Sequence, residues 1–533
     1  MQARRLRAQV VVAGGGPVGM LVAAELAAYG VDTVVFEAGT RVSERPKATT
    51  LHARAVQSLA RRGHLPPTSA SYAASTSSAS YASYAPSASY DRTGSGSPFH
   101  FAGLPGLVIT APKSEPEPIL KCPQAELERL FEARARAAGA RILRGHRVTA
   151  VVQEPGGVRI TAEGPAGRTA CTARYLVGAD GARSTVREQA GIASDTHPAT
   201  VSALMGAVTL LDPEALAAGW HRTPRGWIAA KRDAEGLTHL RTLNCAHAPH
   251  DRRSEPTLDE LRREVAWIAG RDIAMEGPRW LSRFSDFARL ARTFRAGRVF
   301  LAGDAAHVHF PIGGQGLSTG VLDALNLGWK LALTVRGAAG PELLATYDPE
   351  RRPVARRVID NTRAQLALMR PGSELDALRE VFAGLLAGDR DHGRISAMIS
   401  AQDTVLPEGA GRPSSGAGTF LHNVALTTDT GESDVIRLLQ DGRPLLLLFG
   451  EQGARYAAAA QDWAGVLRVE RARPAAGVPY DALLVRPDGY VAWAPGGEDL
   501  DAALSVYFAR GARLAPGPTA PAQAEAGAPS AAS

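Results

Sequence analysis

The segment Gly14-Gly15-Gly16-Pro17-Val18-Gly19 constrains the fold of this chain more than any other. It lies between an apolar run, residues 10–12, and a helical pattern, and a second strand-like run follows at residues 33–36 and leads to Glu37. A strand, a glycine turn, a helix and a second strand with a terminal acid form the βαβ unit that binds a dinucleotide.

The physical role of each part of this unit follows from its chemistry. Gly14 and Gly16 let the backbone turn sharply and approach a pyrophosphate, while Gly19 lets the helix pack closely on the strand. The free N–H groups at the helix N-terminus face the phosphate charge, and Glu37 stands where a carboxylate binds a ribose hydroxyl. The motif alone leaves open whether the ligand is FAD or NAD(P), and a glycine-rich turn in another α/β protein is the alternative interpretation.

Two later motifs favour FAD. Asp180-Gly181 follows a strand-like run, and Gly303-Asp304 follows another that ends at residue 302. A glycine turn after Pro311 then leads into a helical pattern at Gly316. An Asp at the carboxyl end of a buried strand can accept hydrogen bonds from a polyol chain, and the positive N-terminal end of a helix can stabilise negative charge on a ring system. Each motif could be structural by itself, but the three in this order predict a flavin.

Composition limits the remaining function classes. The chain has 533 residues, of which 45% are hydrophobic and 21% charged, which predicts a globular protein of about three domains. The net charge is +7, but the basic residues form no stripe, so we expect no nucleic-acid partner. The three cysteines are widely spaced and predict neither disulfides nor a metal site. No apolar run approaches the ~20 residues of a membrane helix, so we expect no membrane partner and a cytoplasmic location.

The order and spacing of these motifs resemble the flavoprotein aromatic hydroxylases, the single-component FAD monooxygenases that include p-hydroxybenzoate hydroxylase and phenol hydroxylase. The resemblance extends over nearly all of residues 8–495. Further matching segments are Gln124 before its helix, residues 323–330 and residues 347–353. Residues 361–365 and 484–489 are similar to the subgroup that hydroxylates aromatic polyketides such as angucyclines and anthracyclines.

The resemblance implies an α/β fold: a Rossmann-like FAD-binding domain, an inserted substrate domain with a mainly antiparallel sheet, and a C-terminal thioredoxin-like domain. That last domain has no CxxC here, so we expect a structural or dimer role for it. The expected division is FAD-binding domain at 1–65, 121–192 and 284–372 (the last with a long helix), substrate domain at 99–120 and 193–283, helical linker at 373–410, thioredoxin-like domain at 411–513 and disordered tail at 514–533.

Residues 66–98 form a low-complexity insertion in this scheme. The tetrapeptide Ser-Ala-Ser-Tyr begins at residues 69, 78 and 87. Such a segment has too little aliphatic content to supply a core, so we expect a mobile surface insertion. Elsewhere, the hydrophobic pattern predicts helices at 127–138, 316–335 and 353–369, and strands at 148–152, 158–161, 174–177, 298–302, 445–449 and 482–485.

The resemblance also implies site residues. FAD contacts would come from Gly14, Gly16, Pro17, Val18, Gly19, Glu37, Arg45, Lys47, Gln124, Asp180, Arg183, Asp304, Pro311, Gly314, Gly316, Leu317 and Ser318, with Asp180 and Arg183 also serving NADPH. Catalytic candidates are His307 and Pro311, although a histidine beside a glycine turn is more often a packed support. Substrate candidates are Trp220, Trp227 and Arg241, although buried aromatic residues more often belong to a core. Lys47 and Ser318 stand where the family usually has Arg and Asn.

The function that the resemblance implies is an FAD- and NAD(P)H-dependent monooxygenase. It would use O2 to hydroxylate a small polycyclic aromatic molecule through a flavin C4a-hydroperoxide, in antibiotic biosynthesis, as a monomer or homodimer. Baeyer–Villiger oxidation, another oxidative rearrangement and antibiotic inactivation are alternatives on the same scaffold. A flavin-carrying accessory protein without oxygenase activity is an alternative of another class.

Overall fold

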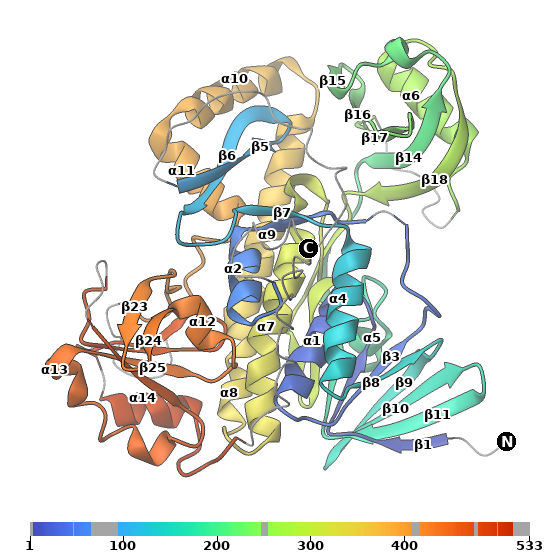
Figure 1. The fold of residues 1–533 in the computed structure, drawn as a ribbon. Helices are drawn as coiled ribbons and strands as arrows, with labels where there is room; N and C mark the ends of the chain where they lie inside the picture. The colour runs from blue at the N-terminus through green and yellow to red at the C-terminus, as the bar shows by residue number, and fades with distance from the viewer. Residues whose placement is uncertain are drawn as a thin grey trace, which may run out of the picture.

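The computed structural model describes residues 4–45, 47–65, 94–246, 254–407, 416–473, 478–497 and 499–514. Figure 1 shows a central region of sheet and long helices, a separate sheet at the upper right and a C-terminal domain at the lower left. Most of the predicted insertion, residues 66–93, and the tail from residue 515 lie outside the described residues.

The central sheet has the strand order β20-β21-β12-β2-β3-β8, and its strands are parallel except for β20. The bounds are β2 (Val10–Ala13), β3 (Thr33–Glu37), β8 (Arg141–Arg144), β12 (Tyr175–Gly178), β20 (Arg295–Ala296) and β21 (Val299–Leu301). β2 is buried along its whole length because both faces of a parallel sheet are covered. The apolar run at residues 10–12 is therefore explained by its position in the middle of this sheet.

Four long helices pack around this sheet: α1 (Pro17–Ala28), α4 (Gln124–Ala137), α7 (Gly316–Val335) and α9 (Tyr347–Met369). α7 spans the predicted residues 316–335, and every residue after Gly316 is buried. α9 begins six residues before the predicted start at Pro353 and includes that proline. The short helices α2 (Ala53–Arg61), α5 (Thr185–Gln189) and α8 (Glu342–Ala345) complete this region.

Smaller sheets flank the central one. One has the order β1-β11-β10-β9, with β1 (Arg4–Arg7), β9 (Arg147–Glu154), β10 (Gly157–Gly164) and β11 (Gly167–Ala173). Another joins β13 (Ser194–His197), β19 (Ala288–Ala291) and β22 (His307–Val308). The predicted strands at 148–152 and 158–161 are confirmed as the central parts of β9 and β10.

The sheet at the upper right of Figure 1 is antiparallel throughout, with the order β15-β16-β17-β14-β18. Its strands are β14 (Ser202–Leu210), β15 (Gly219–Thr223), β16 (Gly226–Arg232), β17 (Thr238–Asn244) and β18 (Met275–Ser285). The amphipathic helix α6 (Leu258–Ala269) packs its buried residues Leu261, Val265 and Ile268 against one face of this sheet. The opposite face is then available to the rest of the molecule.

A hairpin lies between this sheet and the C-terminal domain. It consists of β5 (Gly94–Phe101) and β6 (Leu104–Pro112), and a second pair joins β4 (Thr50–His52) to β7 (Ile119–Lys121). β5 begins at Gly94, so residues 94–98, which we assigned to the insertion, belong to a strand. The low-complexity assignment therefore ends before Gly94. Backbone pairing with β6 extends the strand further toward the N-terminus than the sequence pattern indicated.

The helices α10 (Ser373–Ala387) and α11 (Asp389–Ile399) cover this hairpin. The rings of Phe101 and Phe382 stack with centroids 5.5 Å apart, and His392 bonds the backbone of Val108. Residues 373–399 are helical, as predicted, but they pack on the hairpin and so do more than link two domains.

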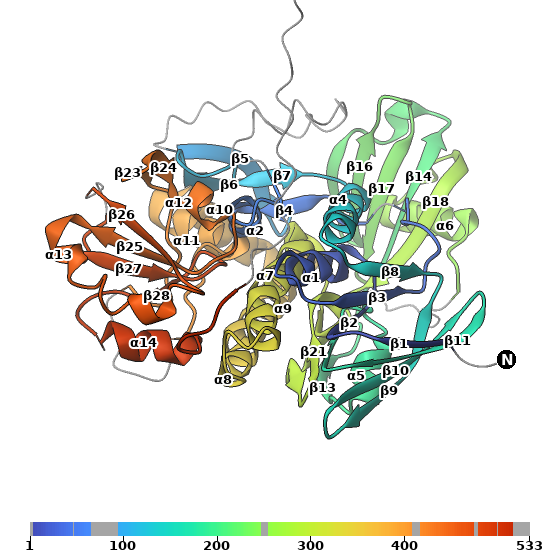
Figure 2. The same ribbon diagram turned by 60° about the horizontal axis from the view of Figure 1, so that its bottom comes forward.

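The C-terminal domain is a six-stranded sheet of order β24-β23-β26-β25-β27-β28. Its elements are β23 (Ala425–Thr428), β24 (Gly431–Asp434), α12 (Val435–Leu439), β25 (Leu445–Phe449), α13 (Gly450–Ala454), β26 (Arg468–Ala472), β27 (Ala482–Val485), β28 (Val491–Trp493) and α14 (Leu500–Tyr507). β25 and β27 have the predicted bounds. Figure 2 shows this domain on one side of α7 and α9, with the central sheet on the other.

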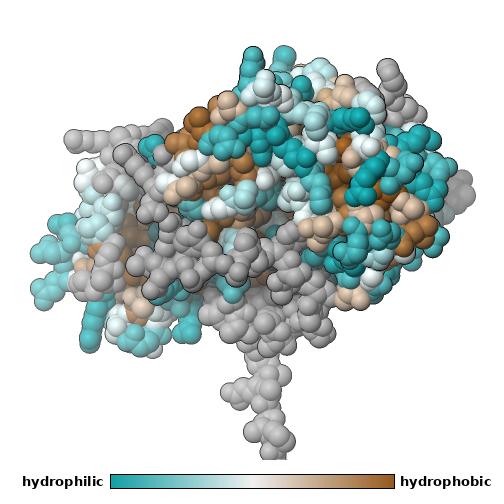
Figure 3. Space-filling view, turned by 90° about the horizontal axis from the view of Figure 1, so that it is seen from above, coloured by the Kyte–Doolittle hydropathy of each residue, from teal (hydrophilic) through white to brown (hydrophobic). Residues whose placement is uncertain are grey.

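The surface seen from above carries two hydrophobic areas (Figure 3). On α10, Leu378, Val381 and Leu385 are exposed. Among the described residues, no helix is long and apolar enough to span a membrane, including the 20-residue α7.

Candidate functional site

The glycine turn before α1 has the close contacts that the sequence predicted. Gly14 has φ +103°, and a Cβ at this position would lie 2.2 Å from the carbonyl oxygen of Ala179. A Cβ on Gly19 would lie 2.0 Å from the Gly14 oxygen, so the helix packs directly on the strand end. A Cβ on Gly16 would meet nothing within 4 Å. Gly16 therefore presents the N-terminus of α1 to open space, where a phosphate group can approach the backbone.

Glu37 stands at the end of β3 beside this turn. Its carboxylate accepts hydrogen bonds from the backbone N–H of Gly15, at 2.5 Å, and of Gly39, at 2.6 Å. These bonds fix the carboxylate next to the glycine turn. A carboxylate has further lone pairs, so Glu37 can also accept a bond from a ribose hydroxyl.

Asp304 differs from the residues on either side of it. Gly303 and Ala305 are buried, whereas Asp304 is exposed. Burial among the surrounding protein raises the pKa of Asp304, while nearby His307 and Lys47 oppose that rise. An accessible carboxylate in a crowded recess is a suitable acceptor for the hydroxyls of a polyol.

The motifs converge in space. A Cβ on Gly303 would lie 3.1 Å from the side chain of Val18, so the Gly303-Asp304 segment lies against the start of α1. Asp180 follows Ala179, which contacts Gly14. The charge of Lys47 opposes the rise that burial causes in the pKa of Asp304, so Lys47 lies near this carboxylate. The N–H of Gln124 donates to the carbonyl oxygen of Ala48 at 3.0 Å, so Gln124 lies beside the residue that follows Lys47.

Asp180 has internal partners. Its carboxylate accepts from the Ser184 hydroxyl at 2.5 Å and from the Val186 N–H at 3.1 Å, which caps α5. Burial raises the pKa of Asp180, and the bond from Ser184 opposes this rise. Arg183 is exposed. The roles that we predicted for Asp180 and Arg183 toward a cofactor stay predictions, while the capping role of Asp180 is visible.

Asp323 of α7 organises the Gly303-Asp304 segment. Its carboxylate accepts from the Gly303 N–H at 3.1 Å, from His307 Nε2 at 2.7 Å and from Arg351 Nε at 2.8 Å. Burial alone would raise the pKa of Asp323, but His307 and Arg351 hold it below its ordinary value. His307 is buried and its ring also packs on Phe294. This geometry favours a supporting role for His307 over the catalytic role that we predicted.

The turn before α7 combines an exposed proline with two glycines of positive φ. Pro311 is exposed, and Gly313 and Gly314 have φ +76° and +62°, which favour glycine. The residues 316–318 that follow form the N-terminus of α7. The Ser318 hydroxyl accepts from the His52 N–H at 3.0 Å, so the serine found in place of Asn joins β4 to α7.

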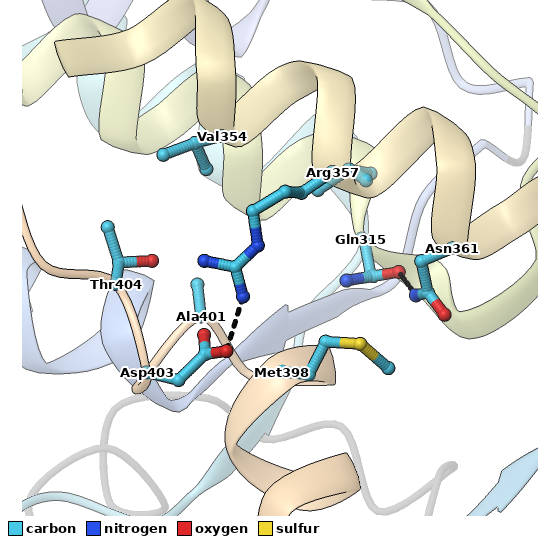
Figure 4. A pocket seen from close by; sticks show the side chains of 9 residues that line it. Gln315, Val354, Arg357, Asn361, Met398, Ala401, Asp403 and Thr404 are labelled. Atoms are coloured by element: carbon cyan, nitrogen blue, oxygen red, sulfur yellow. Dashed lines mark hydrogen bonds and ion pairs between the residues drawn. The ribbon is translucent and has the colours of Figure 1, made fainter.

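A separate hollow lies behind this turn (Figure 4), lined by Gln315, Val354, Arg357, Val358, Asn361, Met398, Ala401, Asp403 and Thr404. Gln315 Oε1 accepts from Asn361 Nδ2 at 2.6 Å, and Gln315 Nε2 donates to the Ile399 oxygen at 3.2 Å. An ion pair joins Arg357 to Asp403 across the hollow. These contacts tie the turn to α9 and α11.

The predicted substrate residues lie together on the antiparallel sheet but differ in exposure. Trp227 is buried, and its Nε1 donates to the Met369 oxygen at 2.6 Å, so it is held in place by the core. Trp220 is 37% exposed and meets Trp227 edge to face at 5.9 Å. Arg241 is exposed. Trp220 and Arg241 can therefore reach a ligand, whereas Trp227 packs against Trp220 from the core.

The remaining basic candidate, Arg45, is exposed and 4.0 Å from Glu255. Sequence reasoning did not identify the residues that hold the two aspartate motifs in place. Arg187 NH1 donates to the Ala305 oxygen at 2.9 Å and thereby joins the two aspartate motifs, but a lone arginine carries no signal of such a contact. Asp323 and Arg351 lie in segments 323–330 and 347–353, which match the family. That match was the available signal for the ion pair between them. No group of three metal-binding side chains occurs in the described part of the chain.

Known proteins resemble this chain along nearly its whole length. Residues 7–362 match a family described as FAD binding domain, and residues 414–511 match one described as aromatic-ring hydroxylase, C-terminal. A 12-dehydrotetracycline 5-monooxygenase/anhydrotetracycline 6-monooxygenase of Streptomyces rimosus is 36% identical over 526 residues, covering 94% of this chain and 99% of the relative.

Two solved structures share the fold over the same extent. CabE, an aromatic hydroxylase from angucycline biosynthesis, has a TM-score of 0.82 at 31% identity, covering 94% of this chain and 99% of CabE. A Diels–Alderase of pyrroindomycin biosynthesis has a TM-score of 0.76 at 34% identity, with the same two shares of 94% and 99%.

Proposed function

This chain belongs to the FAD-dependent aromatic-ring hydroxylases, and from that premise we propose that it uses FAD, NADPH and O2 to hydroxylate a polycyclic aromatic compound of polyketide type in antibiotic biosynthesis. The observation that carries the proposal is the convergence of three separated segments, at Gly14, Ala179 and Gly303, around the start of α1. The tetracycline and angucycline relatives support the polyketide class.

The residues present fit FAD. The N-terminus of α1 with Gly14, Gly16, Pro17, Val18 and Gly19 would hold the pyrophosphate, Arg45 and Lys47 would neutralise it, and Glu37 would bind the ribose. Asp304 and Gln124 would hold the ribityl chain. Pro311, Gly314 and residues 316–318 would border the ring. Open space at Gly16 and an exposed, crowded Asp304 are the features that such a ligand requires.

The bound flavin would supply electron transfer and the activation of O2, and the protein would orient and shield it. The N-terminus of α7 would direct its dipole toward the ring and would stabilise negative charge on it. Asp323 keeps Asp304 in place through Gly303 and His307. Asp180 and Arg183 would contact NADPH as it passes.

We assign the antiparallel sheet and the β5–β6 hairpin to the substrate domain, and residues 411–513 to a thioredoxin-like domain with a structural or dimer role. A cytoplasmic monomer or homodimer is the expected form. The C-terminal sheet supports this assignment through its central β25, which pairs in parallel with β26 and antiparallel with β27.

A direct test is to purify the full chain, measure its flavin spectrum and follow NADPH oxidation with a panel of polycyclic phenols. We expect yellow protein, substrate-stimulated oxidation and a product heavier by one oxygen atom derived from labelled O2. No stimulation by any compound in the panel would overturn the proposal.

The Diels–Alderase relative favours a second candidate, a flavin-carrying protein that rearranges its substrate without oxygenation. This candidate predicts a product of unchanged mass that forms without NADPH. The same incubations, repeated without NADPH and analysed by mass, separate the two.

A further inference from the structure

Lys121 occupies a particular place beside the turn that precedes α7. It ends β7, directly opposite Thr50 of β4, and its Nζ donates to the Thr50 hydroxyl at 2.8 Å. A Cβ on Gly314 would lie 3.4 Å from the Cβ of Thr50. Lys121 is an exposed residue whose ammonium end is partly buried against Thr50, next to the position proposed for the flavin ring.

β4 is also joined to this turn by His52. The Nε2–H of His52 donates to the Gly313 oxygen at 2.8 Å, because a carbonyl oxygen can only accept. Nδ1 of His52 is then an acceptor, and it has no partner among the described residues. Burial lowers the pKa of His52 to about 4, with Lys121 and His100 adding to the effect. The histidine is therefore neutral and adds no charge to the cluster.

The charged groups around Lys121 are cations. The partial burial of its ammonium, together with the nearby charges of Arg241 of β17 and Lys231 of β16, lowers the pKa of Lys121 to about 8. Among the described residues, the charged groups that act on this lysine include no carboxylate. Figures 1 and 2 both show β7 between the β5–β6 hairpin and the sheet that carries β16 and β17. Positively charged side chains from β7, β16 and β17 therefore lie near one another.

Aromatic rings line the same place in a continuous series. The Lys121 Nζ lies 5.7 Å from the Phe99 ring centroid, and Phe99 stacks on His100 at 4.9 Å. His100 meets Trp220 at 5.2 Å, and its Nδ1 is buried without a partner among the described residues. Burial, Lys121 and Arg241 lower the pKa of His100 to about 4, so this ring is neutral as well.

We propose that Lys121, together with Arg241, binds the aromatic substrate through a ring oxygen in its ionised form, while Phe99, His100 and Trp220 stack on the rings. The inference rests on the proposed function and specifies its substrate class as a polycyclic phenol or enol that binds as the anion. The hydroxyl proton passes to solvent on binding. The negative charge then raises the electron density of the ring carbon that is to be oxygenated.

The test uses alizarin, a dihydroxyanthraquinone whose anion absorbs at longer wavelength than its neutral form. Alizarin is titrated into the FAD-loaded full chain at several pH values, and the ionisation of the bound dye is read from the difference spectrum. We expect the wild type to lower the pKa of bound alizarin relative to the free dye. In Lys121→Met that pKa should rise by about one unit, a tenfold change, because a neighbouring opposite charge has gone.

Two further variants control for structure. Lys121→Arg keeps the charge and should keep most of the effect, while Lys113→Met removes an exposed lysine just after β6 and should change nothing. Flavin content and the circular dichroism spectrum establish that each variant is folded. An unchanged alizarin pKa in folded Lys121→Met overturns the inference, and so does a wild type that does not ionise the dye.

A measurement on the wild type alone covers the case in which Lys121→Met does not fold. The chain has only five lysines, so amine acetylation can be followed at each by mass spectrometry. Lys121 should react at lower pH than Lys113, and alizarin should protect Lys121 and leave Lys113 reactive. Equal reactivity or equal protection counts against the inference.

The failure of this inference and the failure of the proposed function give different results. Substrate-stimulated NADPH oxidation with no role for Lys121 would leave the proposed function intact, whereas dye ionisation without any stimulated oxidation would overturn only that function.

Discussion

Two lysines in this protein have a pKa lowered to about 8, yet their surroundings are opposite. Lys330 of α7 is buried, and its Nζ donates to Glu350 Oε2 at 2.7 Å. Burial lowers its pKa and Glu350 counteracts this. Lys121 is an exposed residue whose ammonium is only partly buried, and the described charged groups that act on it, Arg241 and Lys231, are cations like itself.

The Lys330 cluster is complete within the protein. Arg486, from the turn after β27, bonds Glu350 at 2.8 Å and Asp488 at 2.7 Å, so two cations meet two carboxylates between α7, α9 and the C-terminal domain. A buried charge that is matched in this way is structural. The described charged groups that act on Lys121 are cations, which is the arrangement expected where a ligand supplies the negative charge. Charge balance, rather than pKa, distinguishes the two regions.

The largest effect should come from breaking the balanced cluster. Glu350→Gln removes the carboxylate shared by Lys330 and Arg486 and leaves an uncompensated buried charge. We expect a loss of about 3–5 kcal/mol in the free energy of unfolding, measured by urea denaturation. Glu342→Gln, at an exposed position of α8, is the matched control and should stay within about 0.5 kcal/mol. Similar small effects for both variants would show that the cluster is not structural.

The comparison predicts that an exposed charged group in a crowded recess binds a ligand. A substitution at Asp304 tests this prediction. Asp304→Ala removes a charged acceptor for the ribityl hydroxyls, and such bonds contribute about 1.5–3 kcal/mol. FAD affinity should therefore fall about tenfold to a hundredfold, measured by flavin fluorescence titration. Asp272→Ala, on an exposed loop, should bind FAD like the wild type. Full flavin retention in Asp304→Ala would show that this carboxylate is not the ribityl ligand.

The sequence predicted the parts of this molecule that local pattern determines. The helix α7 and the strands β25 and β27 have their predicted bounds because long or fully apolar runs between turns leave little choice. The predicted glycine contacts are present because only glycine tolerates the approach of Gly14 to Ala179. The family was likewise identified from motifs whose spacing is a local property.

The unpredicted parts depend on contacts between distant segments. Residues 94–98 resemble low-complexity sequence and become a strand only because β6 pairs with them. Lys121 is the last residue of a three-residue strand and has no local sequence signal. Its significance comes from β4, β5, β16 and β17, which the fold alone brings together. Sequence reasoning therefore named His307 and Pro311 as catalytic candidates and did not single out Lys121.

Replacing each lysine by methionine should give effects of opposite sign. Lys330→Met leaves Glu350 without one of its buried donors, so we expect a loss of about 1–3 kcal/mol in the free energy of unfolding. Lys121→Met relieves repulsion from Arg241 and Lys231. It should raise stability by no more than about 0.5 kcal/mol, because solvent screens this exposed side chain. Losses of equal size in parallel urea titrations of both variants would contradict the distinction between the two regions.

The smallest effect is a dependence on pH and salt. Because the folded-state pKa of Lys121 is about 8 and its ordinary value is 10.5, the unfolded chain holds more protons in that window, and stability should rise with pH across it. Lys330 has the same two values and should contribute in the same direction. The free energy of unfolding of each methionine variant, measured by urea titration, should therefore rise less steeply with pH than that of the wild type between these pH values. Added salt should reduce the difference between wild type and Lys121→Met, since that lysine is exposed, and leave the difference for buried Lys330→Met almost unchanged. An equal response of both differences to salt would mean that the two lysines share one kind of environment.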